Sequence, residues 1–262
     1  MSLLRILVKS VTFILTMLCY FITSFTVYAL FGFSFDRARP TLTKIIRLTS
    51  KVALVVFNIK IIKPELPKDL TSNYLIVSNH LTYLDIFIIS DSFPSCFVTS
   101  KEMKETPFLG QVCLLAGCLF VERRKRSGIT GEVNELARAL INGLNVSIFP
   151  EATSTNGEAV IKFRRPLFQA AINSKADILP LCINYRRLDG EKLTLKNRDQ
   201  VFWYDDTTFL KHVVRLFSHK SVVAELSVLP IIKTNSFEDK NALADATYAV
   251  IEKEYDKVIE AL

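Results

Sequence analysis

A run of 26 residues without a charged side chain, Ser10 to Phe35, constrains this chain more than any other part of its sequence. A helix of that length is long enough to cross the hydrocarbon core of a bilayer. Arg5 and Lys9 precede the run, but it has neither the shorter apolar region nor the small-residue cleavage site of a signal peptide. We therefore expect the mature protein to keep the segment, either spanning the membrane or lying in it as half of a helical hairpin.

Positive charge is concentrated in the same part of the chain. Residues 1–63 contain nine Lys or Arg residues against one acidic residue, Asp36, a net charge of +8, whereas the remaining residues hold 24 basic and 25 acidic side chains, a net charge of −1. Three of the cations, at Lys44, Arg47 and Lys51, are spaced so that they share one helical face. This pattern indicates attraction to membrane lipids, at the cytoplasmic face where anionic headgroups are found, and not binding to nucleic acid.

The proline-containing segment Lys63–Asn73 separates this N-terminal part from the rest of the chain. We expect residues 1–63 to form a membrane-embedded segment of two helices and residues 64–262 to form an α/β domain. In the second part, short apolar runs alternate with helical patterns, which is typical of a mixed, largely parallel sheet flanked by helices.

The expected strands of this domain are Tyr74–Ser78, Cys96–Thr99, Cys118–Glu122, Val146–Phe149, Ile178–Tyr185 and Val222–Leu229. The expected helices are Asp85–Ser90, Pro107–Ala116, Glu132–Asn142, Leu167–Lys175 and Thr208–Phe217. A last helix is expected to begin at Ser236, which with Asp239 resembles a capping box.

Polar side chains follow three of the predicted strands. Asn79 and His80 follow the first, Arg123 and Arg124 the third, and Glu151 the fourth. Because the carboxyl ends of parallel strands meet at one edge of a sheet, we expect these groups to share one site.

Within that site, His80 and Asp85 are the candidate base and the carboxylate that orients it. On one continuous helix they would point about 140° apart, so we place His80 in the turn after the strand and Asp85 in the first helical turn. A carboxylate on one ring nitrogen fixes the tautomer and leaves the other nitrogen to accept a proton. No G-x-S-x-G motif supplies an enzyme nucleophile. The pair therefore predicts deprotonation of a substrate hydroxyl. A thioester hydrolase in which His80 and Asp85 activate water or bind metal, a non-enzymatic membrane-anchored scaffold and a buried structural histidine are the alternatives.

Two segments together resemble a known family. Asn79, His80 and Asp85 match the block Asn-His-x-x-x-x-Asp, and "FPEATST", residues 149–155, matches the block Phe-Pro-Glu-Gly-Thr of the glycerolipid acyltransferase family. Three further segments resemble other conserved parts of that family, namely "SKEMKETPFLG", "GCLFVERR" and "ILPLCINY". The resemblance covers roughly residues 74–186.

The resemblance implies a membrane-bound O-acyltransferase of the bacterial inner membrane. The acyl donor would be acyl-CoA or acyl carrier protein, with no metal or other cofactor, and the acceptor a lysophospholipid, first of all 1-acyl-sn-glycerol-3-phosphate. His80 would be the base and Asp85 its orienting partner. The residues implied in substrate binding are Asn79, Lys101, Arg123 or Arg124, Glu151 and Thr153. Because Glu151 is itself an anion, we expect it to hold an arginine in place and not to contact phosphate.

Two departures from the family pattern bear on the acceptor. Ser154 stands where an arginine is common and Pro166 where a glycine is common, so Lys162, Arg164 and Arg165 are the expected replacements for the missing cation. Another headgroup, such as that of a lyso-ornithine lipid, therefore stays open. Ala152 in place of glycine predicts that the backbone there does not require a positive φ.

Overall fold

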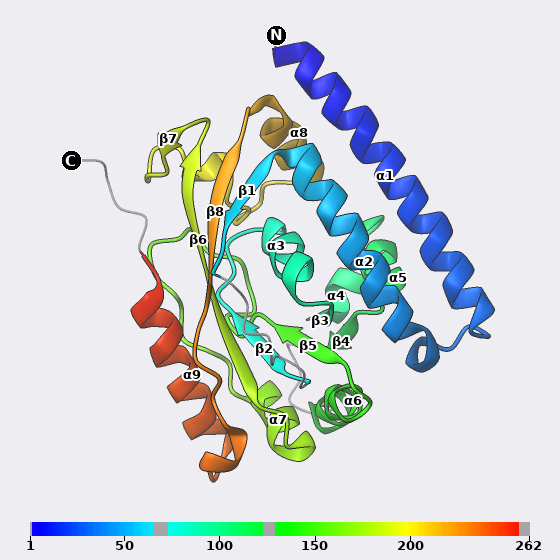
Figure 1. Cartoon of the computed structure of the whole chain (residues 1–262), viewed down its shortest axis with the longest axis vertical. Coiled ribbons are helices and arrows are strands. Elements are labelled where there is room, and N and C mark those ends of the chain that lie inside the picture. Colours follow the sequence, from blue (N-terminus) through cyan, green and yellow to red (C-terminus); the bar gives the residue numbers. More distant parts are fainter. Residues whose placement is uncertain (1, 65–72, 123–128, 257–262) are drawn as a thin grey trace.

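The computed structural model describes residues 2–64, 73–122 and 129–256 and has the predicted architecture, a mixed sheet flanked by helices (Figure 1). The strands lie in the order β1 (Ile59–Ile62), β8 (Val222–Val228), β6 (Ile178–Leu188), β2 (Leu75–Ser78), β5 (Asn145–Ile148), β3 (Ser95–Ser100) and β4 (Leu119–Val121). From β6 to β4 all neighbours are parallel, whereas β8 runs antiparallel to β6 and carries the parallel β1 at the sheet edge. A short β7 (Glu191–Lys192) pairs with the end of β6.

The helices cover both faces of this sheet (Figure 1). One side carries α1 (Ser2–Leu30), α2 (Phe35–Phe57), α3 (Leu84–Ser92), α4 (Lys101–Glu105), α5 (Leu109–Leu115) and α8 (Phe209–Ser218). The other carries α6 (Ile129–Ile141), α7 (Gln169–Ser174) and α9 (Lys240–Glu254). Three 3₁₀ turns complete the described elements, at Pro166–Phe168, Arg198–Gln200 and Thr234–Ser236.

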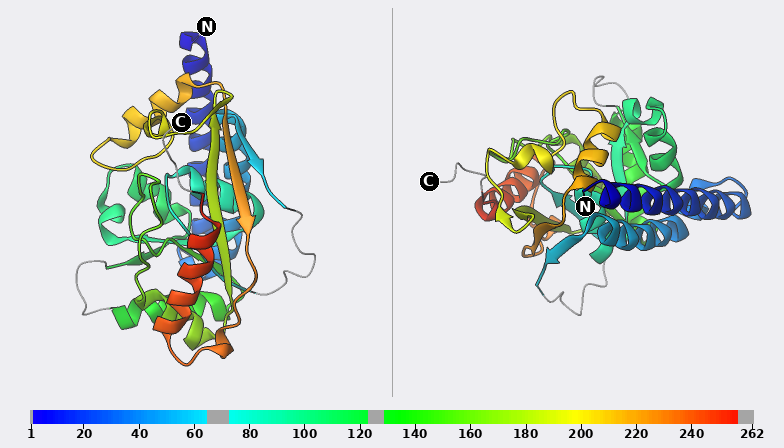
Figure 2. Two further views of the ribbon diagram at one scale, coloured as in Figure 1. Left: turned by 90° about the vertical axis from the view of Figure 1, so that its left-hand side faces the viewer. Right: turned by 90° about the horizontal axis from the view of Figure 1, so that it is seen from above.

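The two N-terminal helices form a hairpin that lies against the α/β body (Figures 1 and 2). Within the described residues, the stretch Leu3–Leu30 is the one helical segment long and apolar enough to cross a membrane, by length and composition. Its inner side packs aromatic rings: Phe13 meets Phe57 and Phe217 edge to face, with both centroid distances at 5.7 Å. Its outer side exposes large apolar residues, among them Leu3, Leu7, Val11, Ile14, Leu18 and Phe25.

The boundary predicted at residue 63 falls after a strand, not at the end of a purely helical segment. Helix α2 ends at Phe57, Asn58 takes a left-handed conformation with φ of 55°, and the next four residues form β1, which pairs with β8. The apolar and cationic pattern of this stretch hid the strand, because four residues are too few to show a clear two-residue period. Whether residues 1–63 are embedded in a membrane stays a prediction.

All six predicted strands are present, and each predicted end coincides with the observed one or differs from it by at most three residues. The central ones are easy to recognise because they are buried on both faces, as in β2, where all four residues are buried. The short β1, β7 and α4 were not predicted. The last helix also begins later than expected, because Asp239 itself caps α9 by accepting from the amides of Asn241 and Ala242.

Candidate active site

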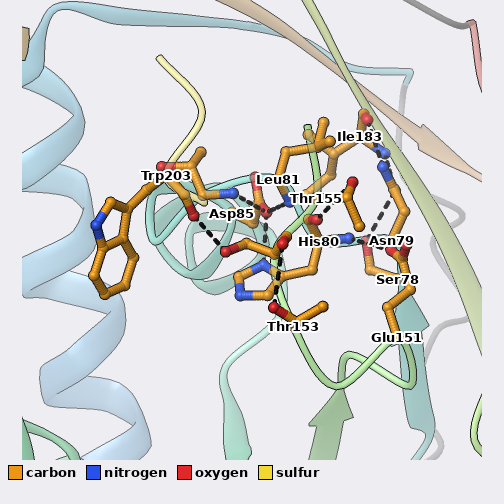
Figure 3. Close-up of polar contacts among 12 residues, drawn as sticks. Ser78, Asn79, His80, Leu81, Asp85, Glu151, Thr153, Thr155, Ile183 and Trp203 are labelled. Atoms are coloured by element: carbon orange, nitrogen blue, oxygen red, sulfur yellow. Dashed lines mark hydrogen bonds and ion pairs between the residues drawn. The ribbon is translucent and has the colours of Figure 1, made fainter. Parts of the chain in front are cut away.

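His80 and Asp85 are in contact, as their spacing predicts (Figure 3). His80 lies in the turn after β2, Asp85 lies in the first turn of α3, and His80 Nδ1 is 2.9 Å from Asp85 Oδ2. The Asp85 side chain is fully buried, whereas the His80 side chain is 19% exposed. The pair thus has a shielded carboxylate behind an accessible imidazole, whose Nε2 lies on the ring edge away from Asp85.

The buried Asp85 carboxylate is satisfied by four donors. Besides the His80 ring, Oδ2 accepts from the amides of Leu81 at 2.7 Å and Thr82 at 3.0 Å. The other oxygen, Oδ1, accepts from the hydroxyl of Tyr185 on β6 at 2.8 Å. Such a set of bonds offsets the cost of burying an ionised carboxylate, so Asp85 can remain a charged partner for the imidazole.

The turn that carries His80 is held from several sides. Its amide donates to Glu151 Oε1 at 2.7 Å, and its carbonyl accepts from the amide of Thr155 at 2.9 Å. The imidazole stacks on the ring of Phe149, with centroids 4.0 Å apart and planes inclined by 15°. The segments after β2 and β5 therefore do share one edge of the sheet, and the second positions the histidine of the first.

That Glu151 holds an arginine stays a prediction, because Arg123 and Arg124 lie outside the described residues. Glu151 Oε2 accepts from the amide of Ile161 at 2.9 Å while Oε1 accepts from that of His80, so within the described residues the carboxylate joins main-chain segments and does not hold an arginine. Burial raises the pKa of Glu151 to about 8, although both amide bonds act in the opposite direction. Its function here is to fix the geometry of the loop.

The expectation for Ala152 is wrong. Its φ is 62°, in the left-handed region where the family's glycine fits without strain. Its amide donates to the carbonyl of Phe149 at 3.0 Å, which closes the tight turn at the end of β5. This turn places Phe149 against the His80 ring and brings the Glu151 carboxylate to the His80 amide. The backbone therefore keeps its left-handed conformation even though Ala152 carries a Cβ atom.

A cavity of about 380 Å³ opens at the imidazole. Its polar lining includes His80, Thr153 and Ser154, and its walls are contributed by α1, α2, α3, β3 and α5. The apolar residues on these walls include Phe13, Met17, Ile46, Phe87, Val112 and Phe149. The cavity therefore runs from the His80–Asp85 pair towards the N-terminal hairpin.

The loop after Phe202 bonds the turn that carries His80. The Trp203 amide donates to the carbonyl of Leu81 at 3.0 Å, and the Ser154 hydroxyl donates to the carbonyl of Trp203. Ser154, at the position where the family often has arginine, thus bonds this loop. Trp203 also lines the cavity, a position that its sequence context did not reveal.

The other predicted binding residues are dispersed. Asn79 is buried and binds the main chain of Ile183 through both ends of its amide, at 2.9 and 2.8 Å, so it joins β2 to β6 and is not directed at a substrate. Lys101 lies at the start of α4 and pairs with Glu132 at 2.8 Å. That contact with the carboxylate raises the pKa of Lys101.

The predicted replacement cations also separate. Arg165 points to α9, where it bonds both oxygens of Asp245 at 3.0 and 2.9 Å. Lys162 and Arg164 are exposed, and Arg164 lines a smaller cavity of about 90 Å³ together with Glu132 and Ala152. Arg123 and Arg124 lie outside the described residues.

The sequence did not reveal how Tyr185 and Phe149 contact the His80–Asp85 pair. Tyr185 on β6 donates to Asp85, and Phe149, which begins the segment after β5, stacks on His80. His212 is likewise buried, 3.0 Å from the Tyr83 hydroxyl, and burial lowers its pKa to about 4, so it is neutral near pH 7.

The sequence is similar to known proteins. The model of the Acyltransferase family matches residues 58–184. The chain is 30% identical over 171 residues to 1-acyl-sn-glycerol-3-phosphate acyltransferase of Neisseria gonorrhoeae, covering 65% of each chain. It is 31% identical over 175 residues to lyso-ornithine lipid O-acyltransferase of Pseudomonas aeruginosa, covering 66% of this chain and 65% of the relative. The matches thus span about 65% of the length of these curated relatives.

The fold also has a counterpart among solved structures. The crystal structure of the 1-acyl-sn-glycerophosphate (LPA) acyltransferase PlsC from Thermotoga maritima superposes with a TM-score of 0.66 and 18% sequence identity, covering 97% of this chain and 96% of that one. The match includes the N-terminal hairpin as well as the α/β body, since it covers nearly the whole of both chains. Taken with the signature blocks and their placement around His80, these findings show an Acyltransferase-family domain over residues 58–184 and support the glycerolipid acyltransferase family.

Proposed function

We propose that this protein is an O-acyltransferase that moves a fatty acyl chain from a thioester to the free hydroxyl of a lysophospholipid. The observation that carries the proposal is the His80–Asp85 pair beside a mainly apolar cavity that His80 lines. His80 Nε2 takes the proton of the acceptor hydroxyl as its oxygen attacks the thioester carbonyl. The tetrahedral intermediate then expels the thiolate, which receives that proton from the imidazolium, and the imidazolium is stabilised by Asp85 in the interval.

The cavity supports a lipid substrate. Its walls are mainly apolar and its volume lies within the range typical of sites for small molecules. Because α1 and α2 contribute to the walls, the acyl chain would enter beside the exposed outer face of the hairpin. We therefore place the enzyme on a membrane, at the cytoplasmic face of a bacterial inner membrane, with the hairpin in contact with lipid.

The acceptor that we favour is 1-acyl-sn-glycerol-3-phosphate, with acyl-CoA or acyl carrier protein as donor. Support comes from Arg164 in the small cavity next to Ala152 and from the relatives named for this acceptor. A lyso-ornithine lipid is the second candidate, favoured by Ser154, which binds the Trp203 loop where the family often has a cation, and by the relatives named for that lipid.

The test is a set of acyl-transfer assays on purified protein with each acceptor and each donor. His80→Ala is expected to lower turnover by about 10²–10⁴-fold or more, because the general base is lost. His219→Ala serves as a matched control, since that imidazole pairs with Asp189 at 3.0 Å outside the cavity. Near-normal turnover by a folded His80→Ala variant would refute the assignment. Equal thioester release with and without acceptor would show a hydrolase instead.

A further inference from the structure

The two oxygens of Asp85 are supported very unequally. Oδ2 receives the His80 ring and two main-chain amides, whereas among the described residues Oδ1 receives one donor, the hydroxyl of Tyr185 at 2.8 Å. Tyr185 lies on β6, 100 residues further along the chain, and only 5% of it is exposed. A buried carboxylate oxygen with a single donor depends on that donor.

We propose that Tyr185 is a positioning residue for the acyl-transfer reaction, and this inference rests on the function proposed above. By holding Oδ1, the phenol hydroxyl stops rotation of the carboxylate group and keeps Oδ2 aimed at His80 Nδ1. Without it, the carboxylate would turn to find another donor for Oδ1, and the imidazole would lose the fixed orientation and tautomer that a general base requires.

The position of the tyrosine ring is itself fixed by the fold. The pairing of β6 with β8 shifts register between Tyr185 and Arg187, an irregularity of the kind that redirects side chains next to active sites. The ring then packs edge to face on Phe202, with centroids 5.6 Å apart. Phe202 in turn fills the space beside Gly157, where a Cβ atom would lie 2.3 Å from the phenylalanine ring.

Tyr185 is also suited to act as a permanent donor. Burial and the negative charge of Asp85 both raise its pKa well above the ordinary value, so the hydroxyl keeps its proton throughout the working pH range. It can therefore support the carboxylate without adding or removing charge at the site.

The test is Tyr185→Phe, which removes one oxygen atom and leaves the ring. We expect kcat to fall about tenfold with KM unchanged, the size of effect typical when a partner behind a reacting group is removed. Tyr255→Phe is the matched control, because that buried hydroxyl donates to the Gly157 carbonyl at 2.9 Å and does not touch Asp85. We expect Tyr255→Phe to lose about as much stability as Tyr185→Phe, while its kcat falls by less than twofold.

A double-mutant cycle separates positioning from general loss of structure. In an Asp85→Asn background, Tyr185→Phe is expected to change kcat by less than about twofold, since the carboxylate it positions is absent. The proposal is overturned if Tyr185→Phe keeps wild-type kcat, if its effect is the same in the Asp85→Asn background, or if it acts on KM alone.

Two further measurements keep the test decisive. If Tyr185→Phe does not fold, Phe202→Leu is used instead, because it loosens the packing of the Tyr185 ring and leaves the hydroxyl in place. It is expected to lower kcat about threefold, and an unchanged kcat would overturn the proposal.

His80→Ala is measured in parallel. Loss of turnover in His80→Ala with none in Tyr185→Phe rejects only the role of Tyr185, whereas retention of turnover in His80→Ala rejects the proposed function.

Discussion

At the scale of single residues, Glu151 shows how a side chain from a signature block has a structural function in this site. Its carboxylate bonds the amides of His80 and Ile161 and is almost completely buried. Because burial raises its pKa to about 8 in the folded state, the folded protein keeps a proton that the unfolded chain has lost between about pH 5 and pH 8. The stability that this group contributes therefore falls as pH rises through that window.

Glu151→Gln removes this titration. We expect the unfolding free energy of the wild type, minus that of Glu151→Gln, to fall as pH rises, by at most about 1.4 kcal/mol per pH unit. Urea unfolding in detergent at pH 5, 6, 7 and 8 measures it. Other groups titrate in both proteins and cancel in the difference. Curves that stay parallel across this range would contradict the raised pKa.

The residues that sequence reasoning placed correctly are those whose geometry is local. His80 and Asp85 are five residues apart across one strand-to-helix turn, so their contact follows from the turn itself. The partners of Asn79 and Glu151 were not predictable, because Ile183 lies 104 residues from Asn79 and the His80 amide lies 71 residues from Glu151. The left-handed Ala152 was missed because a substitution for glycine was taken to report a relaxed backbone, whereas the turn kept its shape.

At the scale of elements, the attachment of α1 depends on polar contacts at its N-terminal end as well as on aromatic packing. Lys9 Nζ donates to the carbonyl of Phe57 at 3.3 Å and to that of His219 at 2.9 Å, at the ends of α2 and α8. Arg5 donates to the carbonyl of Ser218 at 2.7 Å. These carbonyls lack partners within their own helices, and a cation at a helix C-terminus is favourable, so the two side chains join three helices.

Lys9→Met should weaken this junction by about 1 kcal/mol. The expected result is amide hydrogen exchange about fivefold faster in the first turns of α1, measured by mass spectrometry. Lys60→Met, at an exposed position of β1, is the control and should leave exchange in α1 unchanged. Equal exchange rates in the two variants would show that the Lys9 contacts do not hold the helix.

Element prediction succeeded where an element is long or deeply buried and failed where it is short. The buried strands of the parallel part and the amphipathic α6 were all recognisable, since their periodicity extends over enough residues. β1 has four residues and its partner β8 follows 160 residues later, so neither its period nor its pairing was visible in the sequence.

At the scale of the whole molecule, apolar surface is concentrated on the outer side of the N-terminal hairpin. Leu7 is 60% exposed and Leu18 is 55% exposed, on a helix that packs against the body with its other side. Exposed apolar surface of this extent on a soluble body marks a site of contact with another apolar phase. The cavity wall formed by the same hairpin makes lipid the occupant that we propose.

Leu7→Gln combined with Leu18→Gln should weaken binding to phospholipid vesicles by about 10- to 100-fold, because two large side chains no longer bury apolar area in lipid. Vesicle flotation measures the partition. The control combines Ile141→Gln and Val250→Gln, which are 65% and 36% exposed on α6 and α9, on the other side of the sheet. Equal loss in both double variants would contradict the proposed orientation on the membrane.

The pairing of β1 with β8 has a consequence for how the protein is made. About 160 residues separate the two strands, from Ile62 to Val222, so at about 5–20 residues per second the ribosome needs roughly 8–32 seconds to deliver the second after the first. During that interval the hairpin has emerged but the sheet edge that anchors it does not exist. On the membrane orientation that we propose, the hairpin is therefore available to contact lipid before β8, the partner strand of β1, has been made.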